Sequence, residues 1–248
     1  EDEISGYLCT NCQNMDESEV LVLRNKIENL TEDMALKEVA RWFPSQVCFA
    51  SSLSAEDQVI LHLIANQNLP IRIFTLDTGR LFEETYDLLE KSRLRYKMNI
   101  EVVFPDYKQV EKMVNGKGIN LFYHSVENRK MCCSVRKVEP LRRALEGMKL
   151  WITGLRRQQS QTREHTQLLE WDEVNGLLKF NPLIAWTDEK LWNFIHDHQI
   201  PYNPLHDKGY PSIGCEPCTH AIQPGEDVRA GRWWWEAQGG RECGIHRS

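Results

Sequence analysis

The chain has 248 residues, of which 41% are hydrophobic, with 36 acidic side chains against 30 basic ones. This length can bury one substantial core, so we expect one main domain with short appendages. The acidic balance argues against a general nucleic-acid or anionic-membrane binder. The sequence has no apolar leader and no long apolar run, which predicts a cytoplasmic protein with reduced thiols.

Strands and helices are expected to alternate along the chain. After an acidic extension at residues 1–16, residues 17–43 are typical of one or two helices. The expected strands are 47–51, 71–76, 100–104 and 150–153, and the expected helices begin near 54, 81 and 137. Residues 168–171 and 177–180 resemble a short antiparallel pair, followed by a helix at 188–198 and loops after 201. This order predicts an α/β fold with a mostly parallel twisted sheet and helices on both faces.

Charge is unevenly distributed. Residues 129–163 hold ten basic and two acidic side chains, although the chain as a whole is acidic. A basic block of this kind indicates a small anionic ligand, and the alternative is a solvated helix face.

Small hydroxyl residues and glycines follow several of the expected strands. Ser51 and Ser52 come after the first strand, Thr78 and Gly79 after the second, and Gly154 after the fourth. In parallel sheets ligands bind where strands end and helices begin, and backbone N–H groups there bind phosphate oxygens. The sequence therefore predicts a phosphate-type ligand at this edge.

Cysteines form two pairs and a single residue near the end. Cys132 and Cys133 are adjacent, and Cys215 and Cys218 form a CxxC motif. Four thiolates gathered at one point are the ligand set of an iron–sulfur cluster or a structural zinc. The alternative is that they are buried core cysteines or disulfides. Cys243 stands apart and is available as a nucleophile.

An additional pair, Cys9 and Cys12, lies in the acidic extension. Its spacing suits a metal or redox site, but the extension is short and poor in apolar anchors. We favour a solvent-exposed segment over an ancillary metal or redox role.

Taken together, these motifs resemble those of the assimilatory adenylyl-sulfate (APS) reductases. These enzymes are relatives of the PAPS reductases in the PP-loop adenine-nucleotide superfamily. The resemblance rests on residues 50–57, 76–81, 132–137, 153–157, 179–183, 214–219, 229–235 and 242–246. It covers about 45–246. Unlike ATP-cleaving members of the superfamily, the chain lacks a glycine-rich SGGxDS loop, which counts against ATP cleavage. The family gives no role to Cys9 and Cys12.

The resemblance implies a thiol-based reduction. The Cys243 thiolate would attack the sulfur of adenosine 5′-phosphosulfate and displace AMP, leaving an S-sulfocysteine. Thioredoxin or a similar dithiol would then release sulfite. One 4Fe–4S cluster per chain would be bound by Cys132, Cys133, Cys215 and Cys218. A single reductase domain would span 17–235, and a flexible tail at 236–248 would bring Cys243 to the substrate.

The same resemblance supplies candidate substrate contacts. Lys137, Arg163, Arg229 and Arg232 would surround the departing phosphate, and His246 would favour the Cys243 thiolate. Gly154 and residues 76–79 would hold the nucleoside mostly through backbone groups. The full set of expected contacts is Ser51, Ser52, Leu76, Asp77, Thr78, Gly79, Lys137, Gly154, Arg163, Arg229, Arg232 and His246.

Two other functions are consistent with parts of the sequence. One is a zinc-stabilised nucleotide-binding or regulatory protein in which Cys243 has no role. The other is a PP-loop sulfur transferase acting on a tRNA or an adenylated carrier, against which the acidic balance and the missing glycines count. Within the related reductases, the cluster cysteines accompany use of APS, so we expect APS to be preferred over its 3′-phosphorylated form. A homo-oligomer is compatible with the sequence, which does not fix the oligomeric state.

Overall fold

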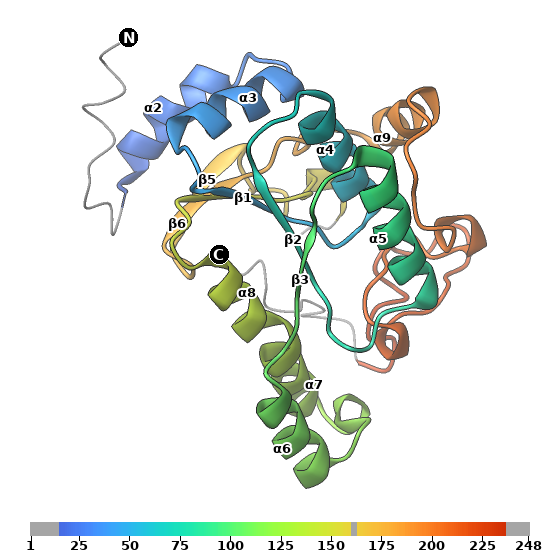
Figure 1. Ribbon diagram of the computed structural model, residues 1–248. Coiled ribbons are helices and arrows are strands. Elements are labelled where there is room, and N and C mark those ends of the chain that lie inside the picture. The colour runs from blue at the N-terminus through green and yellow to red at the C-terminus, as the bar shows by residue number, and fades with distance from the viewer. Residues whose placement is uncertain (1–14, 160–162, 237–248) are drawn as a thin grey trace.

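A computed structural model of the chain describes residues 15–159 and 163–236 (Figure 1). Three expectations lie outside these ranges: the pair Cys9 and Cys12, the nucleophile Cys243, and His246. The described part begins next to Asp16, whose carboxylate accepts a hydrogen bond from Glu19 N and caps the first helix.

A six-stranded sheet in the order β3-β2-β1-β4-β6-β5 forms the centre of the molecule. Its strands are β1 (Val47–Ala50), β2 (Arg72–Leu76), β3 (Glu101–Val103), β4 (Leu150–Ile152), β5 (Leu169–Asp172) and β6 (Leu177–Phe180). All neighbours are parallel except the β5–β6 pair, in which Leu169 lies opposite Phe180. The expected mostly parallel sheet with one antiparallel pair is confirmed.

Eight α-helices are seen in the described ranges. They are α2 (Glu17–Ile27), α3 (Glu32–Trp42), α4 (Ala55–Asn66), α5 (Glu83–Tyr96), α6 (Tyr107–Lys117), α7 (Val126–Cys133), α8 (Glu139–Leu145) and α9 (Asp188–Asp197). The sequence did not predict α6 and α7. Val110, Met113 and Val114 of α6 have helical spacing, but among the residues of α6 only Met113 is buried, so the apolar stripe is short.

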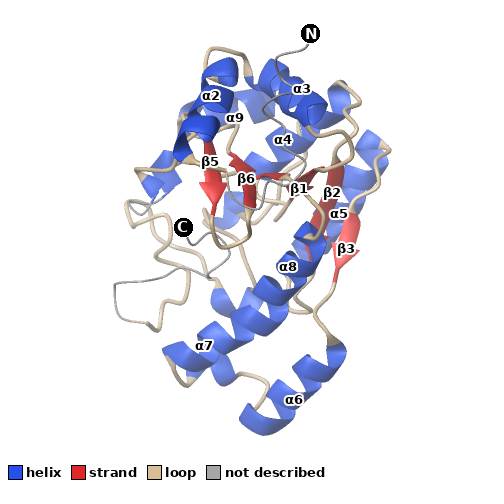
Figure 2. Ribbon diagram, turned by 90° about the vertical axis from the view of Figure 1, so that its left-hand side faces the viewer, coloured by secondary structure: helices blue, strands red, loops and turns tan. Residues whose placement is uncertain are grey.

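Successive side chains of each strand point to opposite faces of the sheet, so neighbouring residues pack into different cores. Phe49 and Ile152 pack into a large core with α2, α3, α4 and α9. Their neighbours Cys48 and Trp151 pack on the other face, against Leu141 and other residues of α8. Helices therefore cover both faces, as Figures 1 and 2 show.

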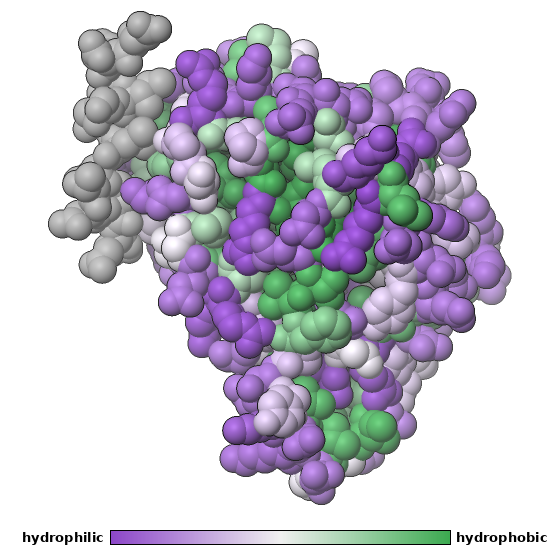
Figure 3. All heavy atoms as spheres, viewed as in Figure 1, coloured by the Kyte–Doolittle hydropathy of each residue, from purple (hydrophilic) through white to green (hydrophobic). Residues whose placement is uncertain are grey.

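A smaller core lies beyond the sheet, in the lobe that α6 and α7 form (Figure 1). It joins Met113, Phe122 and Trp233 to the cysteines of the two pairs. Figure 3 shows apolar side chains reaching the surface over this lobe and over the middle of the same face. Chain segments far apart in the sequence thus meet around the thiols.

The connection from α7 to α8 contains a π-helical turn, Ser134–Val138. Such turns are frequent at functional sites. This one carries Arg136 and Lys137 directly after the cysteine pair. None of the helices in the described ranges is long and apolar enough to cross a membrane.

Candidate active site

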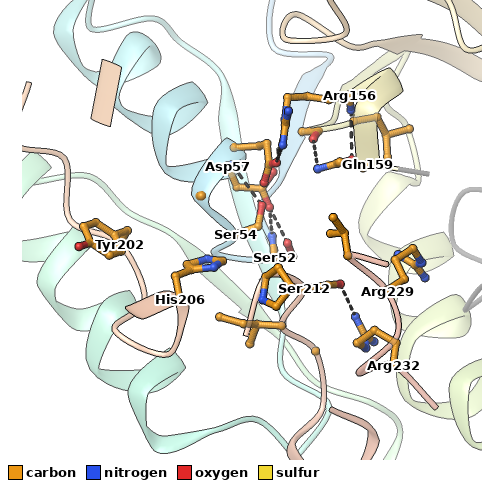
Figure 4. A pocket seen from close by; sticks show the side chains of 18 of the residues that line it. Ser52, Ser54, Asp57, Arg156, Gln159, Tyr202, His206, Ser212, Arg229 and Arg232 are labelled. Carbon is orange, nitrogen blue, oxygen red and sulfur yellow. Dashed lines mark hydrogen bonds and ion pairs between the residues drawn. The ribbon is translucent and has the colours of Figure 1, made fainter. Parts of the chain in front are cut away.

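A cavity of about 850 Å³ opens at the carboxyl ends of β1, β2 and β4 (Figure 4). Ser51 and Ser52 line it after β1, Leu76 and Thr78 after β2, and Gly154 after β4. This is the sheet edge at which the sequence predicted a phosphate-type ligand.

Nine of the expected substrate contacts line this cavity. They are Ser51, Ser52, Leu76, Thr78, Lys137, Gly154, Arg163, Arg229 and Arg232. Asp77 and Gly79 are not among the lining residues. The Asp77 carboxylate instead accepts hydrogen bonds from Gly79 N at 2.7 Å and Tyr86 Oη at 2.9 Å, so it shapes the loop after β2.

The loop after β1 is stabilised by Asp57. Its carboxylate accepts hydrogen bonds from Ser52 N at 2.5 Å and Ser52 Oγ at 2.7 Å. The Ser54 side chain accepts from Asp57 N and begins α4, as its N-cap position predicts. Burial raises the pKa of Asp57 to about 6, although its hydrogen bonds with Ser52 oppose the shift.

Gly154 packs against that carboxylate. A Cβ on this residue would overlap Asp57 Oδ1 and would lie 3.1 Å from Glu56 Cβ. Glycine is therefore needed here to let the strand end approach α4 closely. The same approach leaves the backbone of Gly154 on the cavity wall.

The two arginines after Gly154 have structural partners. Arg156 is 5% exposed in its side chain and forms ion pairs with Glu56 at 2.8 Å and Asp188 at 2.5 Å. Arg157 Nε donates to Thr166 O at 3.2 Å. Arg156 thus joins the start of α4 to the start of α9 across the cavity.

Gln159 is a cavity residue that the sequence did not predict. Its Oε1 accepts hydrogen bonds from Arg163 Nη1 and from Arg156 N. Its Nε2 lies 3.5 Å from Gly154 O. The amide therefore ties the Arg163 guanidinium to the loop after β4.

A second, smaller pocket adjoins the cavity and is lined by all four paired cysteines. Cys132 and Cys133 end α7, and Cys215 and Cys218 come from a 3₁₀ turn (Glu216–Cys218) and the residue before it. The structure thus brings together two pairs that lie far apart in the sequence. Within residues 15–159 and 163–236, no group of three or more His, Cys, Asp or Glu side chains is arranged to hold a metal ion.

Basic residues separate the two pockets. Lys137, Arg232 and Trp233 line both the cavity and the cysteine pocket. The Arg232 guanidinium also lies over the Trp233 ring, 4.8 Å from its centroid. An anion bound at this end of the cavity would therefore interact with the same two basic residues as the thiols do.

These cations affect the thiols unequally. Burial opposes ionisation of Cys215, but Lys137, the Thr78 hydroxyl and Arg232 outweigh it and lower the pKa of this thiol. Burial raises the pKa of Cys218 to about 12. Burial likewise raises the pKa of Cys132. Among Cys132, Cys215 and Cys218, Cys215 is thus the thiol most readily available as a thiolate ligand.

The chain is held in place up to the last residue that the structure describes. Glu236 forms an ion pair with Arg129 of α7, with Oε1 2.8 Å from Nε, and both side chains are buried. Trp235 contacts the Tyr123 ring at 4.4 Å between centroids. Glu236 therefore lies beside the cysteine pocket, which Arg129 also lines.

The fold and the site define an α/β protein in which a cavity with basic side chains is joined to a pocket lined by thiols. The family model of the phosphoadenosine phosphosulfate reductase domain matches residues 46–221, and the chain belongs to this family.

Curated relatives support the same family. An adenosine 5′-phosphosulfate reductase of Allochromatium vinosum is 53% identical over 86% of this chain and 82% of its own length. One of Burkholderia cepacia is 49% identical over 90% of this chain and 88% of its own.

Solved structures show the same fold. A phosphoadenylyl-sulfate reductase of Candida auris, in complex with phosphate, is similar with a TM-score of 0.72 and 26% identity, covering 84% of this chain and 98% of that one. An FMN adenylyltransferase of Candida glabrata in complex with ATP has a TM-score of 0.52 and 18% identity, and the match covers 86% of this chain and 67% of that one. This second likeness concerns the fold alone.

Proposed function

We propose that the chain reduces adenosine 5′-phosphosulfate to sulfite and AMP by thiol chemistry. The observation that carries this proposal is the junction of the two pockets, where Lys137 and Arg232 line both the nucleotide-sized cavity and the cysteine pocket. The relatives named above as adenosine 5′-phosphosulfate reductases, about half identical over most of the chain, support the same substrate.

The nucleophile is Cys243. Its thiolate attacks the sulfur of the substrate, an S–S bond forms, and the bond between that sulfur and the bridging oxygen breaks as AMP leaves. The product on the enzyme is an S-sulfocysteine. A dithiol such as thioredoxin then attacks the sulfur of Cys243, is oxidised to a disulfide, and releases sulfite and the enzyme thiol.

Cys243 can reach the cavity from the position of Glu236. Six residues lie between the two, and the seven residue steps span at most about 25 Å when extended. Because Arg129 fixes Glu236 beside the cysteine pocket, the segment after residue 236 starts near the junction. We assign the reductase domain to 17–235 and a tail bearing the nucleophile to 236–248.

The cations of the cavity stabilise the leaving phosphate. Negative charge grows on the phosphate of AMP as the sulfur–oxygen bond breaks, and fixed cations are worth most in such a transition state. Lys137, Arg229 and Arg232 line the end of the cavity near the thiols, and Gln159 orients Arg163.

The four paired cysteines offer the ligand type that a 4Fe–4S cluster takes, although their side chains are not arranged as a metal site in the described part of the chain. Their donor set is Cys₄, the usual one for such clusters. The pocket that they line also holds Phe122, Pro217 and Trp233 together with five basic residues, and surroundings of this kind would tune a cluster. When bound, the cluster would place a redox-capable anionic group beside Lys137. A thiol-dependent reaction with such a cluster requires a reducing compartment, so we assign the protein to the cytoplasm.

The experiment is an assay of anaerobically purified full-length protein with adenosine 5′-phosphosulfate and reduced thioredoxin. Sulfite and AMP should be released in equal amounts, and iron and sulfide should each amount to about four per chain. Cys133→Ser and Cys215→Ser should lose iron and nearly all turnover. Stoichiometric zinc without sulfide would refute the cluster, and absence of sulfite release from cluster-loaded protein would refute the reaction.

A further inference from the structure

His206 carries a buried ring nitrogen for which the described residues provide no hydrogen-bond partner. The atom is Nε2, and the ring lines the large cavity. Figure 4 shows His206 and Tyr202 on one side of the cavity, with Arg229 and Arg232 on the other. A buried polar atom without a partner costs free energy, so this one points to a ligand.

The ring is held in a fixed position. His206 begins a short 3₁₀ turn (His206–Lys208), and its backbone N donates to Asn203 O at 3.1 Å. Asn203 is 1% exposed and donates from Nδ2 to Thr85 Oγ1 of α5 at 3.1 Å. Trp192 of α9 meets the His206 ring edge-on, with 5.3 Å between centroids. An imidazole fixed on two helices in this way is preorganised for binding.

Its surroundings favour a neutral polar ligand over an anion. Burial lowers the pKa of His206 and so favours the uncharged imidazole, although Glu56 and a backbone hydrogen bond with Tyr210 oppose the shift. A neutral ring nitrogen either donates or accepts a hydrogen bond, and a hydroxyl group can serve as its partner in either case. Asp57, a buried carboxylate without an ion-pair partner among the described residues, also lines the cavity and would repel a phosphate, whereas Glu56 is paired with Arg156.

The difference in charge between the two sides of the cavity indicates how the nucleotide lies in it. Its phosphosulfate belongs with Lys137 and Arg232, next to the thiols, which leaves the sugar and base for the rest of the cavity. Of these two, only the ribose carries hydroxyl groups.

We propose that His206 Nε2 hydrogen-bonds a ribose hydroxyl of the bound adenine nucleotide and helps select a ribose without a phosphate. This inference rests on the proposed function for the identity of the nucleotide. His206 is thus a specificity-determining residue that none of the sequence motifs contained.

The test compares ligands that differ in one hydroxyl. Binding of AMP, 2′-deoxy-AMP and 3′-deoxy-AMP to the cluster-loaded full chain is measured by calorimetry for wild type, His206→Ala and His206→Gln. Wild type should bind one deoxy nucleotide about three- to tenfold more weakly than AMP, the range expected for one neutral hydrogen bond. His206→Ala should lose this preference, and His206→Gln, with an amide at a similar reach, should keep part of it.

His165→Gln is the matched control, because His165 is exposed and does not line the cavity. It should bind all three nucleotides as wild type does. If His206→Ala does not fold, judged by its melting curve, the His206→Gln comparison decides alone.

Three results would overturn the proposal. The first is an equal loss of affinity for all three nucleotides in the His206 variants, and the second is a wild-type chain that binds AMP and both deoxy nucleotides equally well. The third is binding of adenosine 3′,5′-bisphosphate that is tighter than that of AMP and depends on His206. Sulfite release by wild type is assayed in parallel, since a chain that binds AMP with the expected preference but releases no sulfite contradicts the proposed reaction and not the role of His206.

Discussion

Gly214 leaves the space in which the guanidinium of Arg232 lies. A Cβ at position 214 would lie 2.6 Å from Arg232 Cζ and 2.9 Å from its Nη1. The side chain of Arg232, which occupies this space, lines both pockets.

Substituting Gly214 should therefore displace Arg232. In Gly214→Ala the guanidinium must move away from the junction, and a charged hydrogen bond to the phosphosulfate would be weakened. We expect kcat/KM for adenosine 5′-phosphosulfate to fall roughly 10- to 100-fold, measured by sulfite release, with the iron content unchanged.

Gly116→Ala is the control for this substitution. Gly116 lies in α6, and a Cβ there would meet no atom within 4 Å. Activity should be unchanged and the free energy of unfolding should rise by up to ~1 kcal/mol. Wild-type kcat/KM in Gly214→Ala would contradict the assigned position of Arg232.

The ion pair of Glu236 with Arg129 should contribute strongly to stability. The two side chains are 7% and 1% exposed, so Glu236→Ala leaves a buried guanidinium without this carboxylate. We expect a loss of about 3 kcal/mol in the free energy of unfolding, measured by urea denaturation. Turnover should also fall, because the tail that carries Cys243 loses its fixed starting point.

Glu139→Ala is the matched control for that variant. Glu139 also pairs with an arginine, Arg142, but these side chains are 41% and 70% exposed. Its loss should cost less than ~1 kcal/mol. An equal loss in the free energy of unfolding for the two variants would show that burial does not strengthen the Glu236–Arg129 ion pair.

Much of the fold could be predicted because its strands are short apolar runs between helix starts. Phe49 and Ile152 fill the interior as such runs predict. The lobe of α6 and α7 was missed because its apolar contacts are made mainly with distant residues such as Trp233. Periodicity within α6 offers only the short apolar stripe around Met113, and it carries no signal for the contact with Trp233.

The site divides in the same way. Ser51 and Gly154 were predictable, since small residues at strand ends are typical of phosphate sites. His206 was not, because its position depends on the buried hydrogen bond of Asn203 with Thr85. Gln159 was missed for a similar reason: its role is visible only once Arg163 and Gly154 are seen on either side of it.

Asp57 should make stability depend on pH. Burial raises its pKa to about 6 from an ordinary value of 3.8. A raised folded-state pKa gives stability that is fully present below the unfolded-state value and is lost as pH rises through the folded-state value. Relative to Asp57→Asn, wild type should therefore lose roughly 3 kcal/mol between about pH 4 and pH 7.

Urea denaturation of both proteins across this range measures the difference. Asparagine keeps one oxygen to accept the hydrogen bonds from Ser52 but does not titrate. A difference between the two proteins that stays constant with pH would mean that Asp57 ionises as easily in the folded chain as in the unfolded one.

Cys243 should carry the sulfonate after a single turnover. With adenosine 5′-phosphosulfate and no dithiol, the wild-type chain should release one AMP and gain the mass of one sulfonate group on the peptide that holds Cys243. Cys243→Ser should keep its iron and its affinity for AMP but form no adduct, because only the nucleophile is removed. Cys48→Ala is the control: this thiol is fully buried and burial raises its pKa to about 12, so it stays protonated and should not affect the yield. A sulfonate on Cys9 or Cys12, or on Cys243→Ser protein, would assign the nucleophile to another residue and leave the tail without its proposed role.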